Sequence, residues 1–282
     1  MKIFFDHQLI ESFYFWIDHL LVNDGEGYCN FSGSLITGKT FKKNYYFYHS
    51  PQAQWVYDQS QTGANVPTGV TINGTFYGNN VSGVRLSYRD GGVYVPVSLG
   101  NNLVVEASYS AKEYNVYWGD EREESIVASN KWEKYPKSPN NLGPRQTDTK
   151  YLPAVYITYH PVNREALALG GGDFINNGIF KAFIFSEKSK HHISIHNLFQ
   201  NQYNKHFAIY RDIPLESNFG GYKLSVNSFH YDNYSQNQQN QYNNLAYIQD
   251  LSITHLSESF TKNLGKEKIA SVVEFDVQTF RN

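Results

Sequence analysis

Short runs of alternating apolar and polar residues, separated by tight-turn dipeptides, fill most of the chain between residues 27 and 118. The run Val84–Arg89, for example, is followed at once by the turn Asp90-Gly91-Gly92. Alternation of period two places the apolar side chains on one face of a strand, and Asp-Gly tolerates the positive φ angles of hairpin turns. The pattern predicts an inserted antiparallel β-sandwich or barrel over residues 25–118.

The first segment of the chain follows the period of a helix instead. Between residues 6 and 22, large apolar side chains recur three and four positions apart, and Asn23-Asp24-Gly25 supplies a stop. The apolar stripe is wide and aromatic, so the helix must pack on something large, and we expect Trp16 to lie in the core.

Residues 119–150 are rich in Pro, Gly and Asn, which disfavours a regular element and predicts a connection. Residues 151–282 then combine strand and helix patterns, which predicts an α+β unit that also includes the helix of residues 1–24. The elements expected in order are a strand Val155–Tyr159 ending at Pro161, a helical turn Arg164–Leu169, a buried strand Ile179–Phe185, a helix over 190–203 with Ile195, Leu198, Phe199 and Tyr203 on one face, and a strand Phe207–Tyr210.

The last fifty residues predict a polar loop followed by a long hairpin. Residues 231–244 are polar and of low complexity, and we expect a mobile loop there. Two alternating runs follow and predict an antiparallel pair with one wet face. The apolar faces expected are Leu245, Tyr247, Leu251 and Ile253 in the first strand and Ile269, Val273, Phe275 and Val277 in the second.

Composition narrows the classes of protein that fit. Hydrophobic residues make up 40% of the chain, which is enough for a core, while charged residues make up 18%, below the roughly 25% usual for globular domains. The chain has 23 Tyr, a residue suited to half-buried strands and interfaces. The formal net charge of −2 gives no basic excess of the kind that binds nucleic acid.

No segment is apolar for long enough to predict a membrane span. The apolar run at the start is broken by Asp6 and His7, so no secretory signal is expected. Cys29 is the single cysteine, which excludes an internal disulfide, and we expect it to be a small buried residue. Synthesis in a host cytoplasm without secretion is the simplest interpretation.

No catalytic motif stands out, and we predict no catalytic residue and no cofactor. Gly170-Gly171-Gly172 lacks the Lys-Ser or Lys-Thr of a phosphate-binding loop, and Gly25-x-Gly27 follows a helix rather than a strand. The carboxylates of Glu121, Glu123 and Glu124 are close in sequence, but neighbouring residues of an extended segment point to opposite faces, which is poor geometry for acid–base work.

A helix could bring two of the histidines together on one face. His192 and His196 are four residues apart and His191 is adjacent, a spacing that a zinc site can use. No Cys pair and no His-Glu-x-x-His motif supplies further ligands, so we predict no metal site. We expect these histidines to lie on a solvated helix face beside Lys188 and Lys190 instead.

With the β-unit set aside as an insertion, the order of helix, strand, buried strand, helix, strand and hairpin resembles the α+β fold of phage tail-terminator and related neck proteins. The inserted unit also resembles structural proteins of tailed phages, through Tyr28-Cys29-Asn30, Gly63–Val66, Tyr88–Val93 and Tyr114–Tyr117. The resemblance implies a mixed sheet with helices, a homo-oligomeric ring at the neck or tail of a virion, and neighbouring neck, tail tube or sheath proteins as partners.

Three functions remain in competition. The first is a virion structural protein, which would be no enzyme. The second is a carbohydrate- or receptor-binding β-protein of a tail fibre or host-binding module, which the tyrosine-rich composition also fits. The third is a hydrolase whose site residues are scattered along the chain. Internal repeats and coiled-coil heptads, which are typical of fibres, are missing from the sequence.

Overall fold

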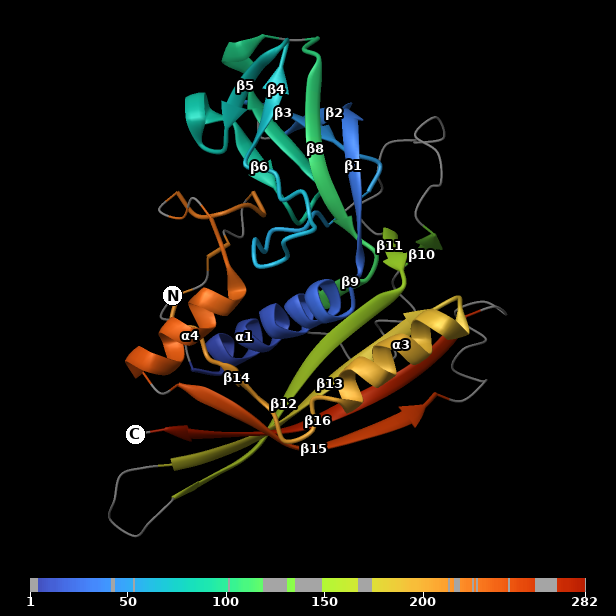
Figure 1. Ribbon diagram of the computed structural model, residues 1–282, viewed down its shortest axis with the longest axis vertical. Helices are drawn as coiled ribbons and strands as arrows, with labels where there is room; N and C mark the ends of the chain where they lie inside the picture. Colours follow the sequence, from blue (N-terminus) through green and yellow to red (C-terminus); the bar gives the residue numbers. More distant parts are fainter. Residues whose placement is uncertain are drawn as a thin grey trace.

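The structure is a computed structural model that describes residues 5–41, 44–52, 54–100, 102–118, 131–134, 149–166, 174–212, 214–215, 219–224, 226, 228–242, 244–256 and 268–281. It is a mixed α+β protein composed mostly of strands in antiparallel sheets, with three α-helices among the described residues. The predicted class is therefore correct at this level. Figure 1 shows a β-rich upper part above a long sheet that carries the helices.

The N-terminal helix forms as predicted. Helix α1 (Phe5–His19) continues into one π-helical turn, η1 (Leu20–Asp24). Its apolar stripe is buried, and the ring of Phe13 stacks on Phe180 with centroids 3.9 Å apart. Trp16 is buried as expected and stacks on Phe207. The wide aromatic stripe is thus accounted for by contacts with a sheet.

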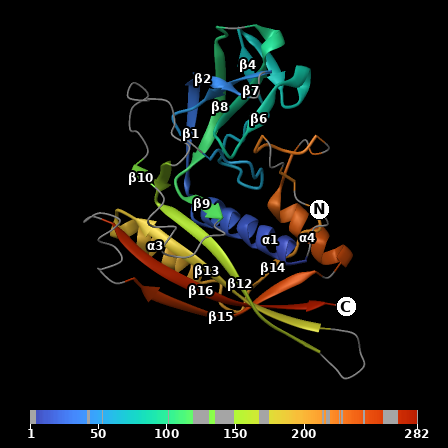
Figure 2. The ribbon, with the colours of Figure 1, turned by 180° about the vertical axis from the view of Figure 1, so that it is seen from behind.

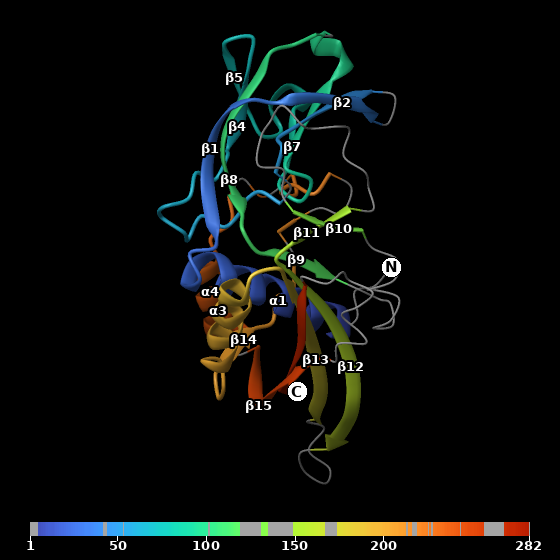
Figure 3. The same ribbon diagram turned by 90° about the vertical axis from the view of Figure 1, so that its right-hand side faces the viewer.

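That sheet has six strands in the order β14-β15-β16-β13-β12-β9. Neighbouring strands are antiparallel except β12 and β9, which are parallel. It curls, as Figure 3 shows, and α1, α3 and α4 lie on the same side of it. The strands are β9 (Asn115–Trp118), β12 (Ala154–Ala166), β13 (Phe174–Ser186), β14 (His206–Ala208), β15 (Leu245–His255) and β16 (Ile269–Arg281).

Strand β9 corrects one predicted boundary. Residues 115–118 alternate like the strands before them and were expected to belong to the inserted unit, but they pair with β12 in the six-stranded sheet. Alternation identifies a strand and says nothing about which sheet it joins.

Between residues 28 and 112 the chain forms two further sheets, each with four antiparallel strands. Their orders are β1-β8-β4-β5 and β2-β3-β7-β6. The strands are β1 (Tyr28–Ser34), β2 (Ile36–Phe41), β3 (Tyr45–His49), β4 (Gly69–Ile72), β5 (Thr75–Gly78), β6 (Arg85–Ser87), β7 (Gly92–Pro96) and β8 (Val105–Lys112), with 3-10 turns η2 (Val81–Gly83) and η3 (Val97–Leu99).

One continuous hydrophobic core joins the upper sheets to the lower one. Phe15 of α1 meets Tyr57, and Tyr88 packs against Tyr222 from the C-terminal half of the chain. The amide of Tyr88 also donates to the carbonyl oxygen of Gly220. The segment around residues 219–224 therefore lies against the upper unit, as Figure 2 shows beside β6.

Helix α3 (Ser189–Gln200) confirms the predicted helix of residues 190–203. Ile195 and Phe199 are fully buried against the sheet, whereas Tyr203 lies beyond the helix end and is exposed. The expected shared face therefore loses Tyr203, because the helix stops before that turn is completed.

Three other predictions are wrong. Residues 231–242 form helix α4 (Tyr231–Tyr242) where a mobile loop was expected. Strand β12 continues through Pro161 with a bulge and reaches Ala166, where a strand end and a helical turn starting at Arg164 were expected. A bulge between Ile248 and Asp250 shifts the register of β15, so the buried residues before it are Ala246 and Ile248 rather than Leu245 and Tyr247.

The second strand of the C-terminal pair, β16, has the predicted faces: Val273, Phe275 and Val277 are buried. The predicted connection of residues 119–150 was expected to hold no regular element, but β10 (Lys131–Lys134) lies within it and pairs in parallel with β11 (Thr149–Leu152), which begins at its end. Glu121, Glu123, Glu124 and Gly170-Gly171-Gly172 lie outside the described residues.

Candidate functional site

The six-stranded sheet ends in two long strand edges. Strand β12 pairs with β13 along its length, but β9 covers only residues 154–157 of its other edge. Strand β15 pairs with β16, while β14 covers only residues 245–247. Among the residues that the structure describes, no strand pairs with the outer edge of β12 from Thr158 to Ala166 or of β15 from Gln249 to His255.

The exposed part of β12 belongs to an arm that it forms with β13 (Figure 1). Residues 161–165 are all exposed, and Val162 has 56% of its surface accessible. Polar contacts join the two strands of the arm, including one in which the Asn177 amide nitrogen lies 2.8 Å from the Asn163 amide oxygen. Arg164 lies over the ring of Phe174 at 4.1 Å. The arm is therefore ordered by side-chain contacts while its edge stays accessible.

Charged side chains line the face of the sheet that points away from α1 and α3. Lys181 of β13 forms an ion pair of 3.0 Å with Glu274 of β16. Asp250 and Asp276 stand directly opposite each other on β15 and β16. Partial burial, followed by the charges of Asp250 and Glu274, raises the pKa of Asp276. This part of the face is polar, as the predicted wet face requires. Further along the same face, Phe183, Phe185 and Val272 are buried in a second hydrophobic cluster, so the prediction of a wet face holds only in part.

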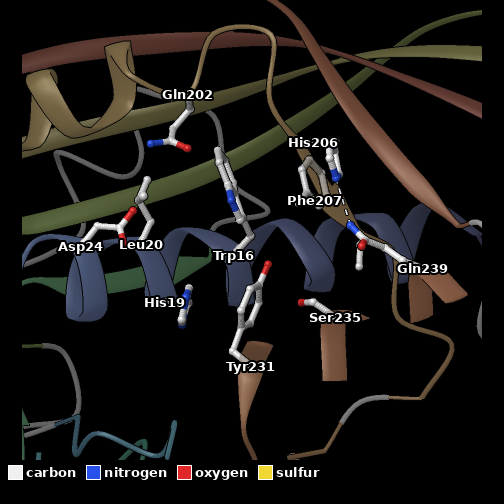
Figure 4. A pocket seen from close by; sticks show the side chains of 11 residues that line it. Trp16, His19, Leu20, Asp24, Gln202, His206, Phe207, Tyr231, Ser235 and Gln239 are labelled. Atoms are coloured by element: carbon white, nitrogen blue, oxygen red, sulfur yellow. Dashed lines mark hydrogen bonds between the residues drawn. The ribbon is translucent and has the colours of Figure 1, made fainter. Parts of the chain in front are cut away.

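A polar pocket of about 210 Å³ lies between α1, α4 and the segment that leads into β14 (Figure 4). Trp16, Phe207 and Tyr231 supply apolar walls. Its polar side chains are Asp24, His19, Gln202, His206, Ser235 and Gln239. The side-chain nitrogens of Gln239 and His206 lie 3.0 Å apart. The volume suits only a small polar molecule, being below the roughly 300–1,000 Å³ of drug-sized sites.

At one wall of this pocket, His19 links three parts of the chain. Its Nδ1 lies 2.6 Å from a carboxylate oxygen of Asp58, and its Nε2 lies 3.5 Å from Asp232 of α4. Its ring stacks on Tyr231 at 4.1 Å. Burial is the largest single influence on the pKa of Asp58 and acts to raise it. The hydrogen bond and charge of His19 act in the other direction, as do the hydrogen bonds from Ser60 and the Tyr231 amide. Together these outweigh burial, and the pKa of Asp58 is lowered.

The pairing of His19 with Asp58 resembles a catalytic dyad in form only. The hydroxyl of Ser60 is 3.4 Å from Nδ1, the same nitrogen that bonds Asp58. A serine nucleophile would need the other ring nitrogen, since the base accepts the hydroxyl proton there. Nε2 instead faces a carboxylate. The arrangement is that of a structural junction between α1, the upper unit and α4.

A second group of histidines corrects a prediction. His192 and His196 were expected on a solvated helix face, but 3% and 9% of their surfaces are accessible. His255 from the end of β15 joins them, with ring centroids 6.3 Å from His192 and 5.5 Å from His196. The Nδ1 of His192 is 3.0 Å from the hydroxyl of Ser186, and Nε2 of His196 is 2.6 Å from that of Ser271. We call these three histidines the histidine cluster.

The pKa values of His192 and His196 follow from this burial. The pKa of His192 is lowered to about 4, chiefly by desolvation and to a smaller extent by the charges of His196 and His255. Desolvation, then His255, also lowers the pKa of His196. Nε2 of His192 is buried and has no hydrogen-bond partner among the described residues. Within that same part of the chain, no group of three or more His, Cys, Asp or Glu side chains is arranged to hold a metal ion.

Cys29 differs from expectation because it is exposed rather than buried. Its sulfur lies 2.9 Å from a carboxylate oxygen of Glu113. This hydrogen bond, followed by burial and the charge of Glu113, raises the pKa of the thiol to about 11. A thiol with a raised pKa is a poor nucleophile at neutral pH, because the thiolate is the reactive form.

Sequence reasoning missed the sites that join distant segments. His19 and Asp58 are separated by 39 positions, and His255 follows His196 by 59. No local motif marks either group. The helical spacing of His192 and His196 was the one available signal, and it located two members of the histidine cluster without its third.

No α-helix in the described part of the chain is both long and apolar enough to cross a membrane. The chain matches no protein family, no curated protein and no solved structure with which it was compared.

Proposed function

We propose that this chain is a structural component of a tailed-phage particle that assembles into a homo-oligomeric ring at the neck or tail, of the tail-terminator or tail-completion type. The observation that carries the proposal is the pair of edges on β12 and β15 that the described strands leave largely uncovered. An edge strand presents a row of backbone donors and acceptors that another strand can pair with. The partners implied are copies of the same chain and the neighbouring neck, tail tube or sheath proteins.

The positions of the two edges suit a ring. β12 and β15 lie on opposite sides of the central pair β13 and β16. Three successive antiparallel pairings separate them, so β12 and β15 run in opposite directions. If each copy is rotated about an axis along the strands, β15 of one copy meets β12 of the next in antiparallel orientation. Such head-to-tail contacts close a ring when the rotation suits.

A structural role without enzymatic activity belongs to the same proposal. The arrangement of His19, Asp58 and Asp232 supports it, because both ring nitrogens of His19 face carboxylates. A virion location is supported only by the element order and the resemblance of the sequence to phage structural proteins.

Receptor or carbohydrate binding is the second candidate, and the polar pocket beside α1 favours it. Aromatic walls with amide and carboxylate groups are the combination that small polar ligands use. Trp16 and Tyr231 are buried, however, and leave little ring surface on which a sugar could stack. A glycan array separates the two candidates, since selective binding would favour receptor recognition.

The test of the assembly proposal is a reconstruction of purified particles. We expect several copies of this chain in a closed ring at the neck or tail, with a β12 edge beside a β15 edge. One isolated copy per particle, or a trimeric fibre at its density, contradicts the proposal.

A further inference from the structure

The histidine cluster lies at the junction of α3 with the sheet. His192 and His196 come from the buried face of α3, and His255 comes from the end of β15. The rings of His192 and His196 are 4.5 Å apart. Their hydrogen-bond partners, Ser186 and Ser271, are on β13 and β16. The cluster therefore ties one helix to three strands.

We propose that the histidine cluster is an acid-sensitive latch, which holds α3 on the sheet while the histidines are neutral and releases it when they are protonated. A hydroxyl can donate to or accept from a neutral imidazole, so Ser186 and Ser271 each satisfy one nitrogen of a neutral ring. Protonation places like charges on rings whose centroids are 4.5 to 6.3 Å apart. It also makes both nitrogens of His192 donors, so that the buried Nε2, which has no hydrogen-bond partner among the described residues, must then carry a proton.

Among the residues that the structure describes, no acidic side chain is a cause of the shifted pKa of His192 or His196. The groups that act on His192 and His196 are members of the cluster itself. The charged or titratable residues at the start of α3 are Lys188, which precedes the helix, with Lys190 and His191; the lysines are cations. Beside the strands they are Glu187 just after β13, Lys268 just before β16, and His255 of β15, while Glu274 lies on the opposite face of β16. Neither of those two glutamates contributes to the pKa of His192 or His196.

The direction of the effect follows from linkage. Because the folded state lowers the pKa of His192 from 6.5 to about 4, its neutral form stabilises the packed helix fully above the ordinary value. That contribution is lost as the pH falls from 6.5 towards 4. From pH 7 to pH 5 the shift of His192 alone changes the opening equilibrium by about 20-fold. The inference concerns packing within one chain and does not depend on the assembly proposal.

Hydrogen exchange of the full chain tests the latch. At pH 7 and pH 5, protection factors corrected for intrinsic exchange are compared for amides of α3 and of β8. We expect those of α3 to fall at least 10-fold at pH 5 and those of β8 to change much less. Equal changes in both elements, or unchanged protection of α3, overturn the proposal.

A variant assigns the effect to the cluster. His192→Leu replaces the buried ring with an apolar side chain, and we expect α3 to lose most of its additional opening at pH 5. The matched control is His160→Gln, which removes an exposed histidine of β12. A wild-type pH response in His192→Leu contradicts the latch. If that variant does not fold, the titration of the histidine rings is followed by NMR in the wild-type protein. A titration midpoint below pH 5 for His192 or His196 supports the latch. Midpoints near 6.5 for both residues overturn it.

Discussion

At the scale of single residues, a buried ion pair constrains the position of α1. The ammonium group of Lys112 on β8 lies 2.6 Å from a carboxylate oxygen of Asp18 on α1, and each side chain is 3% accessible. Lys112 also lies over the ring of Tyr57 at 4.5 Å. This pair fixes the helix against the upper unit at a point where neither charge reaches water.

We expect Asp18→Asn to destabilise the protein by about 3–5 kcal/mol, because it leaves the charge of Lys112 buried without a counter-ion. Urea denaturation at pH 7 measures the loss. The control is Asp212→Asn, which breaks a 2.6 Å pair with Lys223 at a site where the Asp212 side chain is 76% accessible and should cost at most about 1 kcal/mol. Similar losses in both variants would contradict the buried role of Lys112.

The carboxylate of Asp58 predicts a second pH dependence, at lower pH than the histidine cluster. Its folded pKa is lowered, so its contribution to stability is present above the unfolded value of 3.8 and is lost as the pH falls through the folded value. We expect the unfolding free energy of the wild type to drop more steeply below pH 4 than that of Asp58→Asn. Parallel curves for the two proteins between pH 4 and pH 2.5 would show that Asp58 has no such role.

The residue types in these sites could be read from the sequence, but their partners could not. Asp18 and Lys112 are 94 positions apart, and nothing in either local pattern indicates the other. The buried state of Trp16 was predictable because it lies within an apolar helical stripe. The exposure of Cys29 was not, because it depends on where the edge strand β1 stands in its sheet.

At the scale of elements, the contact between the C-terminal half and the upper unit depends on two glycines. Gly220 has a φ of +70°, and a methyl group there would lie 2.8 Å from the Cβ of Arg89 and 2.9 Å from the hydroxyl of Ser87. Gly221 is similarly close to the backbone of Leu86. The chain can approach β6 only because these side chains are missing.

We expect Gly220→Ala to destabilise the protein by about 2–4 kcal/mol, from backbone strain together with overpacking. Gly74→Ala is the matched control, since Gly74 has a φ of +83° but nothing within 4 Å of an added methyl group. That control should lose only about 1 kcal/mol through strain. Thermal or urea unfolding measures both, and equal losses would mean that packing against β6 contributes little.

Helices and strands with a regular pattern of apolar residues could be predicted from the sequence. Elements whose structure depends on contacts with distant segments could not. Helices α1 and α3 and strand β16 follow their patterns because one face is buried along the whole element. Helix α4 has a polar sequence and is ordered by its first turn, where the Tyr231 amide donates to Asp58 at 2.9 Å. The bulge in β15 leaves no signal in the alternation until the register of both strands is known.

The packing of α3 bears on metal binding as well. We expect the protein to retain no stoichiometric zinc and its stability to be unchanged by a chelator. The physical reason is that one ring nitrogen each of His192 and His196 already bonds a serine hydroxyl. Elemental analysis after dialysis measures the metal content. One zinc per chain would overturn this prediction and would require the rings to rotate away from Ser186 and Ser271.

At the scale of the whole molecule, one core spans the units that the sequence divides. The prediction of an inserted β-unit rests on a change of period, and the two four-stranded sheets do occupy residues 28–112. Packing between Tyr88 and Tyr222 nevertheless couples these sheets to the C-terminal half. Change of period locates secondary structure, whereas the extent of a core depends on contacts between segments far apart in sequence.

The proposed ring makes the exposed edge of β12 the place to test assembly. Glu274 is unsuitable as a probe of the edge because it stands on the central strand β16, where it pairs with Lys181. Val162→Lys places a charge on the exposed edge at a residue that is 56% accessible, so the fold of one copy should be preserved while pairing with a neighbour is opposed. Val104→Lys is the matched control, since Val104 is 57% accessible and precedes β8 in the upper unit.

We expect particles made with Val162→Lys to lack the ring in a reconstruction and those made with Val104→Lys to keep it. Both purified proteins should give the circular dichroism spectrum of the wild type. Intact rings in particles that carry Val162→Lys would exclude the β12 edge as the contact between subunits. Loss of the ring in both variants would show instead that added charge disturbs assembly wherever it lies.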